Sequence, residues 1–308
     1  GPGAEALLDK ITSNRLPKKT DGINLTYVLS DAGMIEGELT VTRFGDDLFY
    51  VLSGAGTELE VLDKLRMNAG DDVTIANVSD NYGMLVVAGP KSRDTLAKIT
   101  DADLSNTAFR WLSGQEIDVA GVHCRALRVN YVGELGWELH APMAELETLY
   151  DAIWNAGEEF TIADFGVYAV NSLRMEKAYH GLGSELTNEI TLIEADCERF
   201  YTPTKGDFIG REATEARKAE GITTKLLYFE VAATDCDIRG GEAVMQGDKV
   251  VGVCTSGGYG HATGKSLAFA YVEPGCNDGL DVIILGERQV LHLLGEPAWD
   301  STNARQKA

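Results

Sequence analysis

Alternating apolar and polar residues predict β-strands in the first part of the chain. Residues 35–43 show the clearest alternation, which is typical of a strand with one buried face. Similar runs predict strands at 24–29 and 49–53. Apolar residues at helical spacing predict one helix through 7–11 and another at 57–68.

The middle of the chain combines both periodicities and therefore predicts a mixed α/β region. We expect the following elements there: strands at 73–78, 84–87, 116–122 and 125–129, and helices at 92–99 and 144–156. A longer periodic stretch predicts a helix at 163–179, which leads the chain back to the first region.

The last part of the chain is rich in short strand patterns separated by glycine-containing turns. The expected strands lie at 225–232, 243–246, 249–255, 266–272 and 282–285, with turns at 246–248 and 277–279. Closely spaced strands of this kind predict a small β-barrel or a β-sandwich.

Composition and charge fit an enzyme module. With 308 residues, of which 44% are hydrophobic, the chain can bury a large core and should form two or three domains. No apolar run approaches the ~20 residues that a membrane helix needs, and no secretory signal is visible. The 48 acidic residues outnumber the 27 basic residues, which argues against nucleic acid or an anionic membrane as a partner.

Cysteine and histidine show no arrangement typical of disulfide or metal chemistry. The five cysteines lie far apart without a CxxC pair, which favours reduced, mostly buried thiols in a cytoplasmic protein. The five histidines are scattered and form no His-x-x-x-His pattern, so the sequence predicts no metal site.

The segment 130–139 is the most informative for function. It contains two glycines, one tyrosine and two glutamates, and glycine lets the backbone approach a flat ligand closely. Tyr131 offers a flat face and a hydroxyl, and Glu138 can accept two parallel N–H donors from an amino-pyrimidine edge. The alternative is a β-hairpin or bulge in which the glycines only turn the chain.

Residues 131–138 read Tyr-x-Gly-Glu-x-Gly-x-Glu, which resembles the pterin-binding signature of the aminomethyltransferase (glycine-cleavage T-protein) superfamily. Further segments resemble this superfamily in the same order along the chain: 86–90, 171–178, 208–212, 252–259 and 265–272. Several ordered motifs are more specific than any one of them. Segments 173–179 and 266–272 are most similar to the folate-binding C-terminal half of dimethylglycine and sarcosine dehydrogenases and of dimethylglycine oxidase.

This resemblance implies an α+β fold with three lobes arranged as a cloverleaf around a central folate-binding hole. The lobes are mixed α/β units with antiparallel sheets. The first would combine residues 1–70 with 160–220, the second would span 71–159, and the third, 221–308, would form a small C-terminal β-barrel. Residues Gly1–Gly3 resemble a turn inside the first lobe of relatives, so we expect the chain to begin within that lobe. A protease scar is the competing explanation.

The resemblance also implies a folate-dependent one-carbon transferase. Such a module binds tetrahydrofolate. It captures the one-carbon unit from oxidative demethylation of dimethylglycine- or sarcosine-type amines as 5,10-methylene-tetrahydrofolate. FAD is expected only in an upstream domain or a partner, a flavin-dependent amine dehydrogenase, because no Gly-x-Gly-x-x-Gly follows a strand here. The implied compartment is the cytoplasm, or the mitochondrial matrix in a eukaryote.

Two other functions are compatible with the same resemblance. One is a folate-dependent methyltransferase or demethylase that acts on another methyl donor. The other is a non-catalytic module that retains the fold without the chemistry. Loss of both Glu38 and Glu138 without loss of the physiological role would favour the non-catalytic module.

Glu38 matches the family position of an acidic residue, usually aspartate, beside the folate nitrogens that receive the one-carbon unit. The resemblance therefore implies that Glu38 is catalytic. A fixed carboxylate stabilises a cationic intermediate and can move amine protons. From its position alone, Glu38 would be a solvent-facing strand residue.

The resemblance implies a set of cofactor-binding residues as well. Besides Tyr131 and Glu138, the positions that match the family's folate site are Leu52, Gly54, Arg199, Arg239 and Tyr259. Arg199 departs from the family pattern, because relatives have an aromatic residue there that packs on the benzoyl ring of folate. A guanidinium can also stack on a ring. Arg239 would contact the glutamyl tail or be an ordinary loop arginine, and Tyr259 would line the hole or lie in the barrel.

Overall fold

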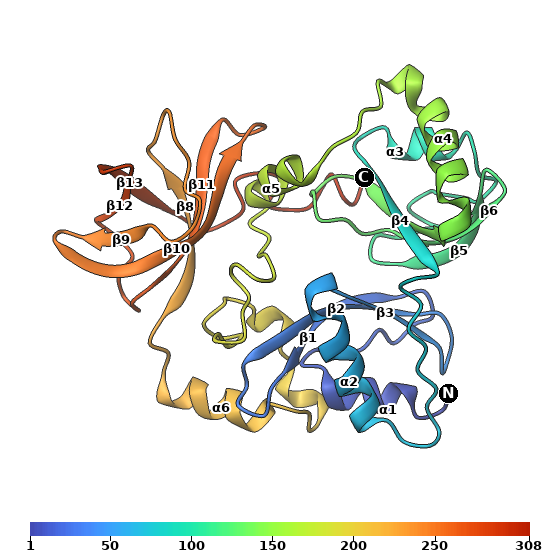
Figure 1. Ribbon diagram of the computed structural model, residues 1–308, viewed down its shortest axis with the longest axis horizontal. Helices are drawn as coiled ribbons and strands as arrows, with labels where there is room; N and C mark the ends of the chain where they lie inside the picture. The colour runs from blue at the N-terminus through green and yellow to red at the C-terminus, as the bar shows by residue number, and fades with distance from the viewer.

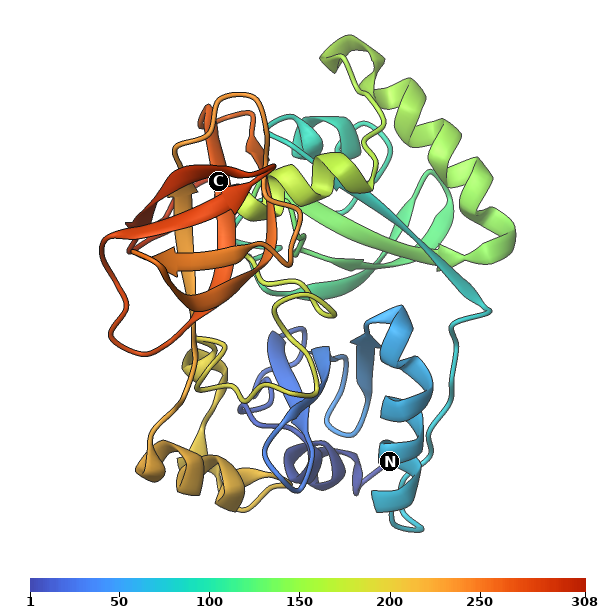
Figure 2. The same cartoon turned by 60° about the vertical axis from the view of Figure 1, so that its left-hand side comes forward.

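The computed structural model describes residues Gly1–Ala308, which form two open sheets and one closed barrel (Figures 1 and 2). The strand orders are β1-β2-β3, β4-β7-β6-β5 and, in the barrel, β10-β11-β8-β13-β12-β9. All strand pairs are antiparallel. The predicted α+β class with antiparallel sheets is confirmed, and the last part of the chain is a barrel, not a sandwich. No helix is both long and apolar enough to cross a membrane.

The first sheet consists of β1 (Ile23–Leu29), β2 (Ile35–Arg43) and β3 (Phe49–Ser53). Helices α1 (Ala4–Ile11) and α2 (Glu58–Asn68) cover one of its faces (Figure 2). The predicted strands of this region and its second helix agree with the structure to within one residue.

Strand β2 shows how the sequence pattern orients the sheet. Leu39 and Val41 are fully buried and pack with Leu8 of α1 and Val61 of α2. Because successive side chains of a strand point to opposite faces, Glu38 faces away from these helices. A one-residue slip would exchange the two faces, so the apolar face fixes the direction of Glu38.

The second part packs helices and a four-stranded sheet around the buried Trp137. Its elements are β4 (Tyr82–Ala88), α3 (Ser92–Leu96), β5 (Gly114–Val119), β6 (Val122–Leu127), β7 (Gly136–Pro142) and α4 (Leu146–Gly157). Strand β7 was not predicted, because its first glycine belongs to a segment whose composition indicates a turn. In the structure, bends occupy only 131–135, and the strand begins directly after them.

The strand predicted at 73–78 is wrong. This segment joins α2 to β4 without regular secondary structure and is called the strap here. Its alternating apolar residues Val73 and Ile75 pack on the core of the first part. The apolar alternation therefore reflects packing on a neighbouring surface and not pairing in a sheet.

The barrel contains six strands. They are β8 (Lys225–Val231), β9 (Ala243–Gln246), β10 (Lys249–Gly260), β11 (Lys265–Val272), β12 (Leu280–Ile284) and β13 (Glu287–Leu294). Strand β13 was not predicted. Only Leu291 among its residues is buried, so the strand lacks the alternation of a half-buried strand.

Helix α5 (Val167–Glu176) is shorter than the helix predicted at 163–179 and packs against the barrel. Asn171 Nδ2 donates a hydrogen bond to the carbonyl of Gly257, at 3.1 Å. Residues of 186–208 pack instead on the first sheet. The boundaries of the three lobes stay a prediction. The remaining helices are α6 (Arg211–Glu220) and the 3-10 helices Ala55–Thr57, Met143–Glu145, Glu158–Phe160, Glu198–Phe200 and Pro203–Lys205.

The C-terminal segment returns from the barrel to the second sheet (Figure 1). The buried Lys177 Nζ donates to the backbone oxygen of Asp300 at 2.6 Å and to Asn303 Oδ1 at 2.9 Å. The Tyr179 hydroxyl donates to Gln306 Oε1 at 3.0 Å. These contacts fix Asn303 and Gln306 in the wall of a central cavity.

Candidate functional site

A cavity of about 590 Å³ lies where the first sheet, the second sheet and the C-terminal segment meet. This volume is in the range of small-molecule sites, ~300–1,000 Å³. Its polar and aromatic side chains come from distant parts of the sequence: Asn14, Asn24, Tyr27, Glu38, Thr40, Trp111, Asn130, Tyr131, Glu138, Tyr179, His180, Arg199, Phe200, Asn303 and Gln306. The cavity therefore brings together four of the predicted site residues: Glu38, Tyr131, Glu138 and Arg199.

Glu38 lies on β2 directly opposite Tyr27 of β1. The Tyr27 hydroxyl donates a hydrogen bond to Glu38 Oε2 at 2.9 Å. Burial raises the pKa of Glu38, and the hydrogen bond from Tyr27 only partly offsets this effect. A carboxyl group whose pKa lies nearer to neutrality is better suited to take up and return protons.

A buried thiol lies behind Tyr27. Cys197 Sγ is 3.7 Å from the Tyr27 oxygen, and His180 Nδ1 is 3.3 Å from the same sulfur. Burial raises the pKa of Cys197 to about 12 and lowers the pKa of His180 to about 4. At neutral pH the thiol is therefore protonated and the imidazole is neutral. The thiol can donate to Tyr27, which leaves the Tyr27 proton for Glu38.

Glu138 occupies the middle of β7, between Val86 of β4 and Leu127 of β6. Its side chain is 18% exposed, and no protein group donates a hydrogen bond to its carboxylate. The nearest cation-forming group is His140, whose Nε2 lies 3.6 Å from Glu138 Oε2. A largely buried carboxylate normally has hydrogen-bond donors, so Glu138 has free acceptor capacity toward a ligand.

Tyr131 forms an aromatic wall of the cavity. Its ring stacks on Tyr179, with centroids 5.7 Å apart and an angle of 26° between the planes. Its hydroxyl donates to the backbone oxygen of His180. Because this hydroxyl is already engaged, the ring face of Tyr131 is the part that is offered to a flat ligand.

Arg199 lies next to an aromatic residue in the cavity wall. Both Arg199 and the next residue, Phe200, line the cavity, and the guanidinium lies 4.7 Å from the centroid of the Phe200 ring. Phe200 also packs edge-on against Tyr27, at 5.7 Å. An aromatic side chain thus lines the cavity directly beside Arg199. The role of Arg199 toward the cofactor stays a prediction.

Comparison with known proteins identifies the family of this chain. Residues 1–205 match the model of the GCVT N-terminal domain, and residues 225–300 match the glycine cleavage T-protein C-terminal barrel domain. The chain belongs to the aminomethyltransferase (glycine cleavage T-protein) family. Its T-protein-like fold agrees with the crystal structure of glycine cleavage system aminomethyltransferase T from Bartonella henselae. That match has a TM-score of 0.86 at 22% identity and covers 98% of this chain and 82% of the other.

The proteins to which this aminomethyltransferase family member is similar differ in total length, so the chain covers a different share of each. The mitochondrial dimethylglycine dehydrogenase of Mus musculus is 38% identical over 304 residues, which cover 96% of this chain and 35% of the relative. The aminomethyltransferase of Koribacter versatilis is 32% identical over 294 residues, which cover 93% of this chain and 76% of the relative. The chain therefore spans about a third of the length of the dehydrogenase that it matches.

Four predicted residues of this family member lie outside the central cavity. Leu52 and Gly54 line a second pocket beside it. Arg239 is exposed in a barrel loop, and Tyr259 on β10 is 43% exposed. Neither Arg239 nor Tyr259 lines either pocket. The assignment of these four residues to the cofactor stays a prediction.

Several residues of the cavity were not predicted from the sequence. Trp111 and Tyr179 add aromatic surface, and Asn303 and Gln306 add amide groups. None of the predicted site positions pointed to them, and the two amides reach the cavity only because the C-terminal segment folds back. All five cysteines are free, and three of them are buried. No group of three or more His, Cys, Asp and Glu side chains is arranged to hold a metal ion.

Proposed function

We propose that this protein binds tetrahydrofolate in the central cavity and captures there the one-carbon unit of dimethylglycine- or sarcosine-type amines as 5,10-methylene-tetrahydrofolate. The observation that carries this proposal is Glu138. A carboxylate in a cavity wall, without any donor from the protein, suits the paired N–H groups of the amino-pyrimidine edge of a pterin. The stacked Tyr131 and Tyr179 provide a flat wall for the same ring system.

Glu38 is the proposed catalytic residue. When bound, tetrahydrofolate supplies two secondary amine nitrogens that accept a methylene unit, and two N–H protons are lost, one to the departing amine and one to solvent. The Glu38 carboxylate lines the cavity and can take up and pass on these protons, and its negative charge favours a cationic donor. Tyr27 holds the carboxylate in place.

The oxidation that precedes capture is assigned to a flavin-dependent amine dehydrogenase domain or partner. The support is the length of the dimethylglycine dehydrogenase, of which this chain matches 35%. Capture next to the site of oxidation would keep a reactive iminium or formaldehyde from meeting other nucleophiles, because the effective concentration of the acceptor is high there.

Folate binding is tested with two matched tyrosine variants. Calorimetric titration of the protein with folinic acid should give a one-to-one complex. Tyr131→Leu should weaken it about 3- to 10-fold, because a stacked aromatic pair contributes ~0.5–1.5 kcal/mol. Tyr150→Leu is the control, since Tyr150 is similarly exposed and is also stacked, on Trp154, but lies outside the cavity. Absence of folinic acid binding in the unmodified protein would favour the non-catalytic alternative.

The Tyr27 hydrogen bond predicts a shift in pH dependence. If Glu38 acts in its ionised form, the rate of methylene-tetrahydrofolate formation should rise with pH through the pKa of this carboxyl group. Tyr27→Phe removes the donor that lowers this pKa, so the pKa should rise and the acid limb should move to higher pH. Tyr228→Phe is the control, because its buried hydroxyl binds the carbonyl of Met175 away from the cavity. If the acid limb of the pH–rate profile were at the same pH in Tyr27→Phe as in the unmodified protein, Tyr27 would not set the pKa of Glu38.

A further inference from the structure

A buried histidine lies beside the proposed pterin anchor, Glu138. His140 follows Glu138 by two residues on β7, so both side chains point to the same face of the second sheet. The histidine is 4% exposed, and its Nε2 atom lies 3.6 Å from Glu138 Oε2. A hydrogen bond between nitrogen and oxygen is usually shorter, at ~3.0 Å. The histidine is therefore next to the anchor without being bonded to it.

The Nε2 atom of His140 has no hydrogen-bond partner in the protein. A buried polar nitrogen without a partner is uncommon in a folded protein. The carboxylate of Glu138, which also lacks a donor, is the acidic group within 4 Å of this nitrogen. Each group thus has an unused hydrogen-bonding atom close to the other, and a small rotation of the Glu138 side chain would join them.

The other ring nitrogen of His140 determines where the ring carries its proton. Nδ1 lies 3.3 Å from the hydroxyl oxygen of Tyr50 on β3. Burial raises the pKa of Tyr50, so this hydroxyl is protonated at neutral pH and can donate to Nδ1. A neutral imidazole has one N–H group, so a ring that accepts a hydrogen bond at Nδ1 carries its proton on Nε2. Nε2 is then a donor on the side of Glu138.

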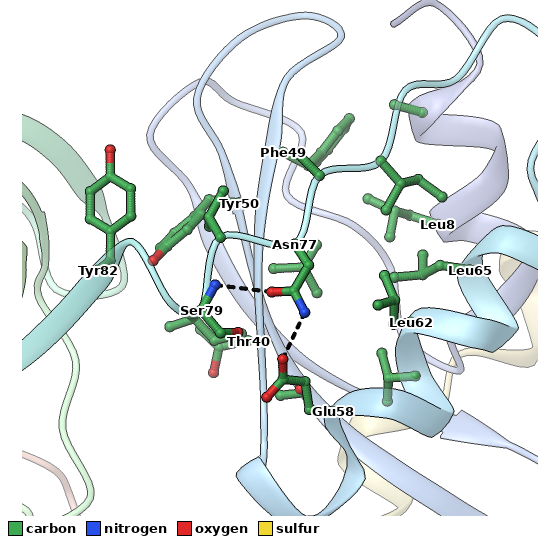
Figure 3. A pocket seen from close by; sticks show the side chains of 18 of the residues that line it. Leu8, Thr40, Phe49, Tyr50, Glu58, Leu62, Leu65, Asn77, Ser79 and Tyr82 are labelled. Atoms are coloured by element: carbon green, nitrogen blue, oxygen red, sulfur yellow. Dashed lines mark hydrogen bonds between the residues drawn. The ribbon is translucent and has the colours of Figure 1, made fainter. Parts of the chain in front are cut away.

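Tyr50 is itself held at the boundary between the two open sheets. Arg125 on β6, directly opposite His140, lies over the Tyr50 ring at 4.7 Å and over the Tyr82 ring at 4.9 Å. Figure 3 shows Tyr50 and Tyr82 together at one end of the second pocket, away from the leucines of α1 and α2. Tyr50 belongs to the first sheet and His140 to the second. Their contact therefore connects the two sheets at the pterin anchor.

We propose that His140 is a positioning residue for the pterin anchor. Its Nε2–H group holds the Glu138 carboxylate in the orientation that receives the pterin, and Tyr50 sets the tautomer that carries this proton. This inference rests on the proposed function, in which Glu138 accepts the paired N–H groups of the pterin. Neither His140 nor Tyr50 lines the central cavity, so both act through the carboxylate and not by contact with folate.

The carboxylate has room for the histidine and the ligand together. Each oxygen of Glu138 can accept two hydrogen bonds, so a bond from His140 leaves acceptor sites for both N–H groups of the pterin. We expect the distance of 3.6 Å between Nε2 and Oε2 to shorten to that of a hydrogen bond when folate binds, because hydrogen bonds of active sites often tighten in the complex.

The hydrogen bond is tested by calorimetric titration with folinic acid. His140→Leu removes the donor but keeps a bulky side chain, so the affinity should fall at least about 10-fold, as for the loss of a donor to a charged group. His140→Gln keeps an N–H group of similar reach and should bring the affinity back to within about 3-fold of the unmodified protein. Equal losses in the two variants would overturn the proposed hydrogen bond.

The dependence on Glu138 is tested in a double-mutant cycle. NMR titration with folinic acid, which also measures weak binding, compares Glu138→Ala with and without His140→Leu. Because the carboxylate is absent from both proteins, the added substitution should change affinity less than about 2-fold. A loss as large as that in the presence of Glu138 would mean that His140 acts through the packing of β7, and it would not be a positioning residue.

The tautomer is tested on the unmodified protein without folate. NMR of 15N-labelled histidine should show a proton on Nε2 of His140, whose signals are assigned by their absence in His140→Gln. A proton on Nδ1 alone would overturn the proposed donor. A folinic acid complex that forms normally and is unaffected by His140→Leu would also overturn this inference, whereas failure of folinic acid to bind the unmodified protein would refute the proposed function.

Discussion

Glu38→Gln should reduce formation of methylene-tetrahydrofolate at least ~100-fold while folinic acid affinity stays within about tenfold. The amide has nearly the same size and can still accept the hydrogen bond from Tyr27. It carries no negative charge and cannot take up a proton at neutral pH. General acid–base catalysis and charge stabilisation each contribute ~100-fold or more in enzymes, so the loss should fall on the chemical step.

The measurement is the initial rate above the uncatalysed reaction when formaldehyde, alone or premixed with a secondary amine, is supplied with tetrahydrofolate. Glu36→Gln is the matched control. Glu36 lies two residues earlier on β2, is paired with Lys64 and does not line the cavity. Equal losses of rate and affinity in Glu38→Gln would make Glu38 a binding group only. A rate equal to that of the unmodified protein would remove Glu38 from the mechanism.

The elements of the first sheet could be predicted because local sequence determines them. Apolar residues of β2 alternate with polar ones, and burying the apolar set against α1 and α2 leaves a single orientation for Glu38. The same reasoning failed for the strap. Val73 and Ile75 alternate as in a strand, but they pack on the core of the first part and pair with no strand.

The surroundings of Glu38 could not be predicted in the same way. Tyr27 and Cys197, which stand behind the carboxylate, are 170 residues apart in the sequence. Gln306 reaches the cavity because Tyr179 holds it across 127 residues. Contacts of this kind depend on how the three parts of the fold are packed together, and no local pattern of polarity encodes them. The resemblance to the family supplied Glu38 and Glu138 but not these partners.

Glu138→Ala should weaken folinic acid binding about 30- to 1,000-fold. The substitution removes both acceptor oxygens from a wall in which no other group replaces them, so two N–H donors of the bound pterin would lose their partners. Leaving buried donors unsatisfied costs roughly 2–4 kcal/mol when the lost acceptor is charged. Glu138→Gln should give a smaller loss, because the amide keeps one acceptor oxygen but turns an N–H group toward a ligand donor. Calorimetric titration measures both.

Glu134 provides the control for this prediction within the same short motif. It lies four residues before Glu138, its side chain is similarly buried at 17% exposure, and it pairs with Arg305 at 3.0 Å outside the cavity. Glu134→Ala should therefore leave folinic acid affinity within about 2-fold, apart from any effect on stability. If Glu138→Ala bound folinic acid as tightly as Glu134→Ala does, the free carboxylate of β7 would not be the pterin anchor. The orientation of folate in the cavity would then have to be sought from Arg199 and the amide groups of the C-terminal segment.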